Sequence, residues 1–368
     1  MKTLKDIKSP KGKKALVRVD YNVPMKGSII LDTRRIDASI PTIQALQKKG
    51  MQVRLLAHLG DGKVSLKPVA NYLSKYFKVE FITGPITKPV PEVPKGTVLL
   101  FENIRRYKEE EKNDPKFAKA LAGLGDVYVN EAFSVSHREH ASIVGITKYL
   151  PAFAGIQLET EIKVLSKVLT NKKHPFLFIL GGAKFSTKIP LLKRFTAIAD
   201  NVVIAGAILN SFYKVSKFEI GASVVEDGYE RDIKALLSSP KLLLPVDAVV
   251  VRNRKRYEVS LDEIQKGDVI VDIGAESVKL IANKIKKAKI IVWNGPTGWY
   301  ERGFVGGTVA LAQAIKATKG VAVIGGGDTA EVIEKIIGKS KNVFISTGGG
   351  ATLDFLADGV LVGVQCLK

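Results

Sequence analysis

The sequence is nearly free of cysteine and has no long apolar run, and each shortage excludes a class of protein. Its 368 residues include one cysteine, Cys366, which has no second thiol with which to form an internal disulfide. Apolar stretches such as residues 202–209 fall far short of the roughly 20 residues that cross a bilayer. Residues 1–14 lack the apolar stretch of a signal peptide. The sequence therefore predicts a cytoplasmic protein with no membrane function.

Acidic residues are scarce relative to basic ones. The chain has 57 lysines and arginines against 36 aspartates and glutamates, a formal charge of +21. Such a charge attracts polyanions, so a basic nucleic-acid-binding protein is the first alternative to consider. The lysines are spread along the chain, as at residues 48–49, 172–173 and 284–289, and no nucleic-acid-binding motif accompanies them. We therefore expect no nucleic-acid partner to be required.

Short runs rich in valine, isoleucine and leucine alternate with amphipathic segments at helical spacing. The expected helices cover residues 36–48, 117–124, 276–286 and 309–317. The expected strands cover residues 15–19, 53–57, 98–101, 127–129, 176–180, 202–205, 248–251, 290–293, 321–324 and 343–345. Strands that alternate with helices predict an α/β fold, in which a parallel sheet is covered on both faces.

The length is too great for one compact core and suits two domains. Residues 149–155 carry the proline and glycine typical of a linker, and the helical stretch 158–169 could join two lobes. We therefore expect two doubly wound, Rossmann-like domains, residues 1–152 and 153–345, joined by a hinge helix. Ligands are expected outside the carboxyl ends of their strands.

Glycine-rich turns follow several of the expected strands in the second half of the chain. Glycine lets the backbone approach a ligand closely, and a helix that starts next to it adds aligned N–H donors, which together favour phosphate. The repeated pattern indicates a nucleotide site, although each glycine alone could serve only a tight turn. The turns are Gly181-Gly-Ala-Lys184, Asn294-Gly-Pro-Thr-Gly298, Gly325-Gly-Gly-Asp328 and Gly348-Gly-Gly-Ala351.

Two common nucleotide motifs fit these turns poorly. The pattern G-x-x-x-x-G-K-[ST] is absent from the sequence. Residues 325–330 match the loose dinucleotide pattern G-x-G-x-x-A, but residues 344–348 offer no acid for a ribose. An NAD-dependent oxidoreductase therefore stays the second alternative.

Charged residues near the turns suit a nucleotide phosphate and its metal. Lys184 and Lys188 are one helical turn apart, so they would project from one face, although they could equally be a solvated helix end. Asp328 could hold Mg²⁺, because hard cations prefer carboxylate and keep substrate oxygens as ligands, or it could be a plain helix N-cap.

The first half of the chain carries arginine and histidine at strand ends in place of glycine loops. Arginine binds phosphate and carboxylate with two parallel hydrogen bonds, so several arginines close together predict a pocket for a small, multiply charged acid. A lone arginine would more often form a surface ion pair, and His137 and His140 could instead bind a metal. The segments are residues 18–22, 34–35, 58–60, 102–106 and 137–140.

In their order from end to end, these segments resemble those of the phosphoglycerate kinase family, and the resemblance covers nearly the whole chain. The matching segments are Val17-Arg-Val-Asp-Tyr-Asn-Val-Pro24, Glu102-Asn-Ile-Arg105, Gly125-Asp-Val-Tyr-Val-Asn130, Gly181-Gly-Ala-Lys184, Leu244-Pro-Val-Asp247, Val292-Trp-Asn-Gly-Pro296, Gly325-Gly-Gly-Asp-Thr329 and Ser346-Thr-Gly-Gly-Gly-Ala351.

The resemblance implies that each domain binds one ligand. The N-terminal domain would bind 3-phosphoglycerate through Asp20, Asn22, Arg35, His58, Arg105 and Arg138. The C-terminal domain would bind Mg-ADP or Mg-ATP, with Glu301 at the ribose and Asp328 at the Mg²⁺, through Gly182, Lys184, Lys188, Gly206, Asn294, Glu301, Gly325, Gly326, Gly327, Asp328 and Thr329. The segment from about residue 346 to 368 would fold back onto the first domain, and the protein would act as a monomer.

The implied enzyme is a phosphotransferase with a carboxyl group as acceptor, which exchanges a phosphoryl group between 1,3-bisphosphoglycerate and ADP. Its nucleophile is already charged, so it needs positioning and charge neutralisation rather than a general base. We assign Arg35 and Lys184 to the transferring group, and we expect a hinge closure that excludes water. Support would come from Lys188, Mg²⁺ and the N–H groups of Gly326, Gly327, Gly348 and Gly349.

The sequence also departs from the family pattern at a few positions. Asp61 replaces an arginine, which predicts a weaker hold on the substrate phosphate, and Thr187 replaces an aspartate before the second lysine. The segment Asn130-Glu-Ala-Phe-Ser134 replaces Asn-Asp-Ala-Phe-Gly, and Ala205-Gly-Ala207 replaces a triple glycine, which could reshape the adenine pocket.

Overall fold

The structure is a computed structural model that describes residues 1–170, 172–338 and 340–368, and of residues 327–329, 331 and 332 it describes the backbone alone. Contacts divide the chain into two compact units. Unit 1 comprises Met1–Val164 and Asp358–Lys368, and unit 2 comprises Leu165–Ala357. Within the described ranges, neither unit contains a helix long and apolar enough to span a membrane.

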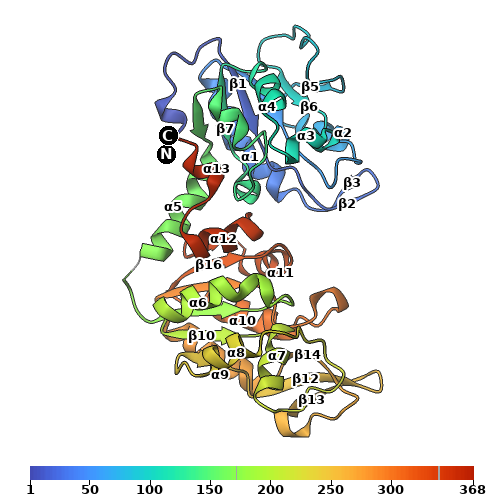
Figure 1. The fold of residues 1–368 in the computed structure, drawn as a ribbon, viewed down its shortest axis with the longest axis vertical. Coiled ribbons are helices and arrows are strands. Elements are labelled where there is room, and N and C mark those ends of the chain that lie inside the picture. The colour runs from blue at the N-terminus through green and yellow to red at the C-terminus, as the bar shows by residue number, and fades with distance from the viewer. Residues whose placement is uncertain (171, 339) are drawn as a thin grey trace. The chain divides into compact units, whose positions relative to one another are not determined.

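The sheet of unit 1 is parallel and runs in the order β5-β6-β4-β1-β7-β8 (Figure 1). Its central strands are buried almost throughout, which explains their continuous apolar sequences. The strands are β1 (Lys14–Arg18), β4 (Gln52–Leu56), β5 (Val79–Ile82), β6 (Val98–Phe101), β7 (Val127–Asn130) and β8 (Ala152–Ala154), with a small separate antiparallel pair of β2 (Met25–Lys26) and β3 (Ile29–Ile30).

The core of unit 1 forms where its helices pack on this sheet. In α1, the buried residues Ile36, Ile43 and Leu46 recur at helical spacing and pack in one cluster with Val17 and Leu55 of the central strands. The helices are α1 (Arg34–Lys48), α2 (Lys67–Leu73), α3 (Lys108–Glu111), α4 (Pro115–Ala122), α5 (Ile156–Thr170) and α13 (Val362–Gln365), with short 3₁₀ turns η1 (Leu4–Asp6), η2 (Ile104–Arg106), η3 (Phe133–Val135) and η4 (Gly145–Lys148).

Unit 2 is built on a second parallel sheet, in the order β11-β10-β9-β15-β16-β17. The two sheets confirm the expected α/β class with doubly wound parallel sheets. The strands of unit 2 are β9 (Phe176–Leu180), β10 (Asn201–Ile204), β11 (Leu242–Leu243), β15 (Ile290–Asn294), β16 (Val321–Gly325) and β17 (Val343–Ile345).

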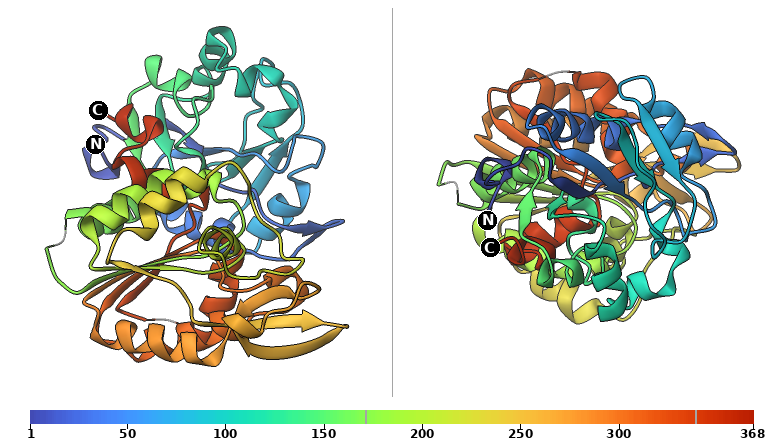
Figure 2. Two further views of the ribbon diagram at one scale, coloured as in Figure 1. Left: turned by 60° about the horizontal axis from the view of Figure 1, so that its bottom comes forward. Right: turned by 90° about the horizontal axis from the view of Figure 1, so that it is seen from above.

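Helices cover both faces of the unit 2 sheet. Figure 2 (left) shows orange helices on one face and the yellow-green α6 on the other, and α10 packs against both α9 and α11. The helices are α6 (Ile189–Ile198), α7 (Ile208–Val215), α8 (Glu230–Leu237), α9 (Ala275–Lys287), α10 (Gly306–Ala317), α11 (Gly327–Ile337) and α12 (Gly350–Asp358), with 3₁₀ turns η5 (Ser186–Lys188), η6 (Leu261–Glu263) and η7 (Tyr300–Arg302).

One expected strand lies outside the parallel sheets. Residues 248–251 fall in β12 (Asp247–Arg252), which pairs antiparallel with β13 (Lys255–Ser260) and β14 (Val269–Ile273). Asn253 and Arg254 both have positive φ, so they form a tight turn, and a strand that follows so tight a turn must pair antiparallel. The alternation of strands and helices did not reveal this hairpin.

The unit boundaries lie further along the chain than the expected residues 152 and 346. Helix α5 continues past residue 164, and Gly350 and Leu353 of α12 line a cavity of unit 2, so residues up to 357 group with that unit. The last residues group with unit 1, where Lys2 N donates to Leu367 O and Gly363 N to Ser136 O. The two termini accordingly lie side by side (Figure 1).

Candidate functional site

The six residues expected to bind an anionic acid gather at one edge of the unit 1 sheet. Parallel strands β6, β4, β1 and β7 are consecutive neighbours, so the segments that leave their carboxyl ends meet at the same edge. Asp20 and Asn22 follow β1, His58 follows β4, Arg105 follows β6 and Arg138 follows β7, while Arg35 lies in the first turn of α1.

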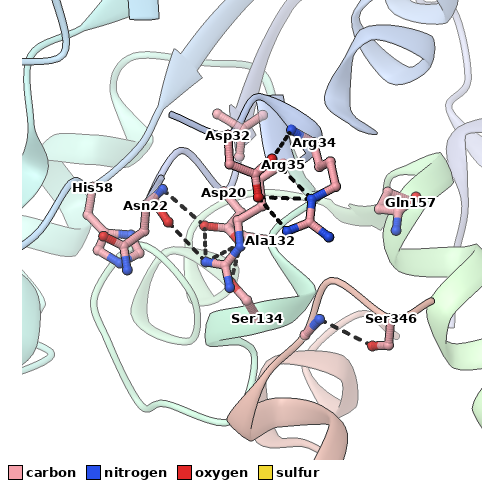
Figure 3. A network of polar contacts seen from close by, with 12 residues as sticks. Asp20, Asn22, Asp32, Arg34, Arg35, His58, Ala132, Ser134, Gln157 and Ser346 are labelled. Atoms are coloured by element: carbon pink, nitrogen blue, oxygen red, sulfur yellow. Dashed lines mark hydrogen bonds and ion pairs between the residues drawn. The ribbon is translucent and has the colours of Figure 1, made fainter. Parts of the chain in front are cut away.

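Asp20 is the centre of the hydrogen bonds at this edge (Figure 3). Its Oδ2 lies 3.1 Å from Nη1 of Arg35 and accepts a hydrogen bond from Ser134 Oγ at 2.5 Å. Arg35 Nη1 also donates to the Asn22 carbonyl at 3.2 Å. Nε and Nη2 of Arg35 donate to no residue in the described part of the chain, so they remain available to a ligand.

The turn after His58 links Asn22 to Arg105. Gly60 N donates to Asn22 Oδ1 at 2.9 Å, and Gly60 O accepts from Arg105 Nη1 at 2.8 Å. Gly62 has a φ of +99°, and a Cβ there would lie 2.4 Å from the Arg105 carbonyl oxygen. Only glycine fits at that position, so the turn can pack against the Arg105 backbone, and the Gly60 carbonyl orients the Arg105 guanidinium.

His58 is 1% exposed and lies against Arg18, whose Nη2 is 3.0 Å from its Nδ1. Burial lowers the pKa of His58 far below its usual range, and Arg18, Arg105, Arg138 and Arg35 lower it further. The imidazole is therefore neutral at pH 7. The edge presents convergent guanidinium groups with one buried carboxylate, Asp20, among them, which suits a ligand with several negative charges.

Asp61, the departure with the largest expected effect, is paired with its neighbour. Lys63 Nζ lies 2.7 Å from Asp61 Oδ2, and the two side chains are 85% and 61% exposed. Lys63 therefore neutralises Asp61 within the loop. Another departure, Ser134, supplies the hydroxyl that binds Asp20 and that a glycine would lack.

Unit 2 contains a cavity of about 590 Å³ at the carboxyl ends of its strands. A large cavity with a few polar groups is the usual form of a small-molecule site. Among the residues expected to bind nucleotide, it is lined by Gly182, Lys184, Lys188, Gly206, Asn294, Glu301 and Gly326, and Gly349 of the last glycine turn lines it too. Gly325 is the last residue of β16 and is not among the lining residues.

Lys188 and Asn294 are hydrogen-bonded to each other in the lining of the cavity. Lys188 Nζ donates to Asn294 Oδ1 at 2.8 Å, and burial lowers the pKa of Lys188 to about 8. Asn294 Nδ2 is enclosed and has no partner among the described residues, so a ligand acceptor would satisfy it. Lys184 is exposed and precedes η5, so the two lysines are not on one α-helical face as expected, although both line the cavity.

The glycine turns of unit 2 pack backbone against backbone. A Cβ at Gly181 would lie 2.1 Å from the Pro296 carbonyl oxygen, and one at Gly206, where φ is +67°, would lie 2.5 Å from Gly182 N. These glycines are therefore required by the fold itself. Ala207 lines the cavity, while Ala205 is fully buried.

Several apolar residues that line the cavity were not identified from the sequence. They are Leu209, Val224, Ile270, Val271 and Trp299. Strand β14, which carries Ile270 and Val271, was missing from the expected strands. Its sequence, Val269-Ile-Val-Asp-Ile273, is the signal that could have located this wall.

Several expected ligand contacts lie outside the described side chains, namely Asp328 and Thr329, while Gly327 is described only as the first residue of α11. Gly348 N donates to Ser346 Oγ at 3.1 Å (Figure 3), so that N–H is engaged. Among the residues whose side chains are described, no group of three or more histidine, cysteine, aspartate or glutamate side chains could hold a metal ion.

Comparison with known proteins gives one consistent family. Residues 4–359 match the family model described as phosphoglycerate kinase. The phosphoglycerate kinase of Dictyoglomus turgidum is 41% identical over 391 residues, covering 100% of this chain and 99% of that protein. That of Moorella thermoacetica is 41% identical over 387 residues, covering 99% and 98%.

Solved structures with a similar fold belong to the same family as these relatives. Phosphoglycerate kinase from Coxiella burnetii is 34% identical, with a TM-score of 0.86 over 99% of this chain and 97% of that one. The enzyme from Pyrococcus horikoshii OT3 is 29% identical, with a TM-score of 0.88 over 100% and 98%. With its family match, its relatives and its fold in agreement over nearly the full length, this chain belongs to the phosphoglycerate kinase family.

Proposed function

We propose that this chain catalyses reversible, Mg²⁺-dependent phosphoryl transfer between 1,3-bisphosphoglycerate and ADP, which gives 3-phosphoglycerate and ATP in glycolysis and gluconeogenesis. The observation that carries the proposal is that one polypeptide of this family has an arginine-rich edge in unit 1 and a glycine-lined cavity in unit 2. The enzyme would act as a cytoplasmic monomer on these small molecules, and neither the oxidoreductase nor the nucleic-acid alternative has any support in the comparisons.

Unit 1 would hold 3-phosphoglycerate. Arg35 would contact the reacting end, because two of its guanidinium nitrogens are free and its third is held by Asp20. His58, Arg105 and Arg138 would hold the remaining negative charge, and Asn22 would keep the turn after His58 in place. Each contact is charge-assisted, so each contributes more than a neutral hydrogen bond.

Unit 2 would hold the nucleotide along its cavity. The apolar lining residues, such as Leu209 and Trp299, suit a base, and Lys188 with Asn294 suits phosphates. Glu301 lines the cavity and would contact the ribose. Gly326, which precedes α11, and Gly349, which precedes α12, would direct backbone N–H groups towards phosphate oxygens.

Mg²⁺ would be held by Asp328 together with nucleotide phosphate oxygens. Residue 328 lies in the first turn of α11, two residues after the cavity-lining Gly326, so its backbone position fits this role. An oxygen ligand of full negative charge is what Mg²⁺ prefers beside phosphates. When bound, the ion would neutralise charge on the phosphates, which is its general contribution in phosphoryl transfer.

The reaction requires positioning rather than proton abstraction, because a carboxylate or a phosphate oxygen attacks directly. Arg35 and Lys184 would stabilise the charge on the transferring phosphoryl group, with Lys188 beside it. Since the acid and the nucleotide are assigned to different units, transfer requires the two ligands to be brought into line with water excluded.

The lowered pKa of Lys188 gives a pH prediction. Its ammonium group is charged below a pKa of about 8 and loses its charge as the pH rises through that value. We therefore expect kcat/KM for ADP, which reports the free enzyme, to fall above about pH 8. Lys188→Arg keeps its charge at these pH values and should flatten the profile. Parallel declines in the parent and in Lys188→Arg would contradict the assignment.

Replacing Asp328, the proposed Mg²⁺ ligand, should change the magnesium dependence of activity. We expect Asp328→Ala to weaken the apparent affinity for Mg-ATP and to lower the rate, because the ion loses its protein carboxylate. A magnesium titration of activity at fixed ATP measures this directly. A titration curve that coincides with that of the parent would show that Asp328 is not a ligand of the ion.

Substitutions of Asp61 and Lys63 should have a smaller effect, which is on the KM for 3-phosphoglycerate. Lys63→Ala should raise the KM for 3-phosphoglycerate about threefold, because it leaves Asp61 uncompensated near an anion, and exposed ion pairs act on this scale. Asp61→Arg should lower the same KM. If neither variant changes the KM, this loop does not contact the substrate.

Ligand-dependent thermal stability tests the nucleotide assignment against the oxidoreductase alternative. A ligand that binds only the folded state at about 100 times its Kd stabilises it by about 2.7 kcal/mol. We expect Mg-ADP to raise the melting temperature and NAD to leave it unchanged. A rise with NAD and none with ADP would reject the proposed function.

A further inference from the structure

A buried chain of hydrogen bonds lies behind the anion site of unit 1. Arg18 at the end of β1 is 1% exposed, and Glu110 of α3 and Ser142 are fully buried. Arg18 Nε lies 2.9 Å from Ser142 Oγ, and Ser142 Oγ lies 2.6 Å from Glu110 Oε1. Ser142 N also donates to Glu110 Oε2 at 2.9 Å. The chain thus connects an enclosed carboxylate to an enclosed guanidinium.

The donor and acceptor roles along this chain follow from the chemistry of its groups. A guanidinium has five donors and no acceptor, so Ser142 Oγ must accept from Arg18. Ser142 Oγ donates its own proton to Oε1 of the Glu110 carboxylate. Arg18 Nη1 donates to the Val19 carbonyl at 2.6 Å. Its Nη2 lies 3.0 Å from His58 Nδ1, so Nδ1 must be the accepting, unprotonated nitrogen.

We propose that Glu110, Ser142 and Arg18 form a positioning chain that fixes His58 as the neutral tautomer with its proton on Nε2. His58 then presents an N–H donor, not a lone pair, to the anionic acid of unit 1. Nε2 forms no hydrogen bond with the described residues and is not among their fully enclosed unpaired atoms, so it is left for a ligand. The inference rests on the proposed function and names how His58 serves it.

The charges around His58 explain why its tautomer matters for binding an anion. Four nearby guanidinium groups disfavour a positive charge on the His58 imidazole. They belong to Arg18 in β1, Arg35 in α1, Arg105 in η2 and Arg138. A neutral imidazole with its proton on Nδ1 would turn a lone pair towards the carboxylate or phosphate and repel it. Burial raises the pKa of the Glu110 carboxyl, while the Arg18 guanidinium and the hydrogen bonds from Ser142 lower it. In the proposed chain Glu110 is the carboxylate that balances the charge of Arg18. His140 Nδ1, 3.9 Å from Glu110 Oε1, is neutral because burial lowers its pKa to about 4.

Nitrogen NMR of the ligand-free, full-length protein tests the proposal without any activity. The chain has four histidines, so histidine-selective ¹⁵N labelling gives few signals, and His58→Gln identifies the one of interest. We expect His58 to show a protonated Nε2 and an unprotonated Nδ1, unchanged between about pH 5.5 and 8.5. A proton on Nδ1, or titration of the ring within that range, would overturn the proposal.

Variants of Ser142 test the chain behind Arg18. We expect Ser142→Ala to mix the His58 tautomers and to raise the KM for 3-phosphoglycerate about tenfold with a smaller change in kcat, because a charged group loses one hydrogen bond. Ser142→Thr keeps the hydroxyl and should restore both readouts. Ser39→Ala removes a buried hydroxyl that bonds Tyr21 and Ile36 instead, and should leave the His58 signals as in the parent.

The NMR and kinetic results distinguish failure of the proposed function from failure of the positioning role of Ser142 and Glu110. A parent chain with the Nε2-protonated signature but no kinase activity would contradict the proposed function alone. A folded Ser142→Ala protein with the parental tautomer and KM would overturn the positioning role of Ser142 and Glu110, whatever the activity of the parent.

Discussion

Arg35→Ala is expected to lower turnover by at least about a hundredfold, the scale on which one preorganised donor to a transition-state oxyanion acts. The variant should also raise the KM for 3-phosphoglycerate. Arg35 keeps two guanidinium nitrogens free while Asp20 and the Asn22 carbonyl hold the third, so the side chain is oriented before any ligand arrives. Steady-state kinetics in the direction of 1,3-bisphosphoglycerate synthesis measures both constants.

The neighbouring Arg34 provides the matched control. It starts the same helix and carries the same charge, but its guanidinium pairs with Asp32 at 2.5 Å. Arg34→Ala should therefore retain turnover close to that of the parent. If Arg34→Ala and Arg35→Ala lost activity equally, the effect would come from charge or folding of this edge, and the specific role of Arg35 would be wrong.

Lys184→Ala should lower turnover by at least about tenfold while nucleotide affinity changes little, because a charge directed at the transition state acts on rate more than on ground-state binding. Lys184 lines the unit 2 cavity and is exposed. Glu226 Oε2 accepts from the backbone N–H groups of Phe185 and Ser186 directly after it, which holds this turn in place without using the ammonium. Binding of ADP by calorimetry, together with kcat, separates the two effects.

Lys193 is the control for this variant. It lies on α6, which follows the same turn, and its ammonium pairs with Asp232 at 2.9 Å outside the cavity. Lys193→Ala should leave kcat and ADP affinity unchanged. A Lys184→Ala enzyme with normal turnover and only a higher KM for nucleotide would assign Lys184 to ground-state binding instead.

Most buried strands of the two parallel sheets were predictable because their sequences are continuous apolar runs. An exception is β8, which is buried but lies within residues 149–155, the segment expected to be a linker. Each expected run is a strand in the structure, with ends displaced by about one residue, as for residues 15–19 against Lys14–Arg18. Strands that do not follow this pattern were missed. β13 is largely exposed and highly charged, and β5 mixes Glu80 with apolar residues, so neither resembles a buried strand.

The residues of the site were predictable where chemistry is concentrated in short segments. Asp20, Asn22 and His58 were expected from their segments, and the strand order brings them to one edge. The supporting residues carry no such local signal. Ser142 and Glu110 are separated by 32 residues, and the role of Ser134 depends on Asp20, 114 residues earlier. Only the fold brings these partners together, so a sequence pattern could not reveal them.

A coupled assay for ATP-dependent formation of 1,3-bisphosphoglycerate by the purified chain is the most direct test of the proposed function. We expect ATP consumption that requires both 3-phosphoglycerate and Mg²⁺, and that falls sharply in Arg35→Ala but not in Arg34→Ala. A folded protein that consumes no ATP with 3-phosphoglycerate and Mg²⁺ present would contradict the proposed function.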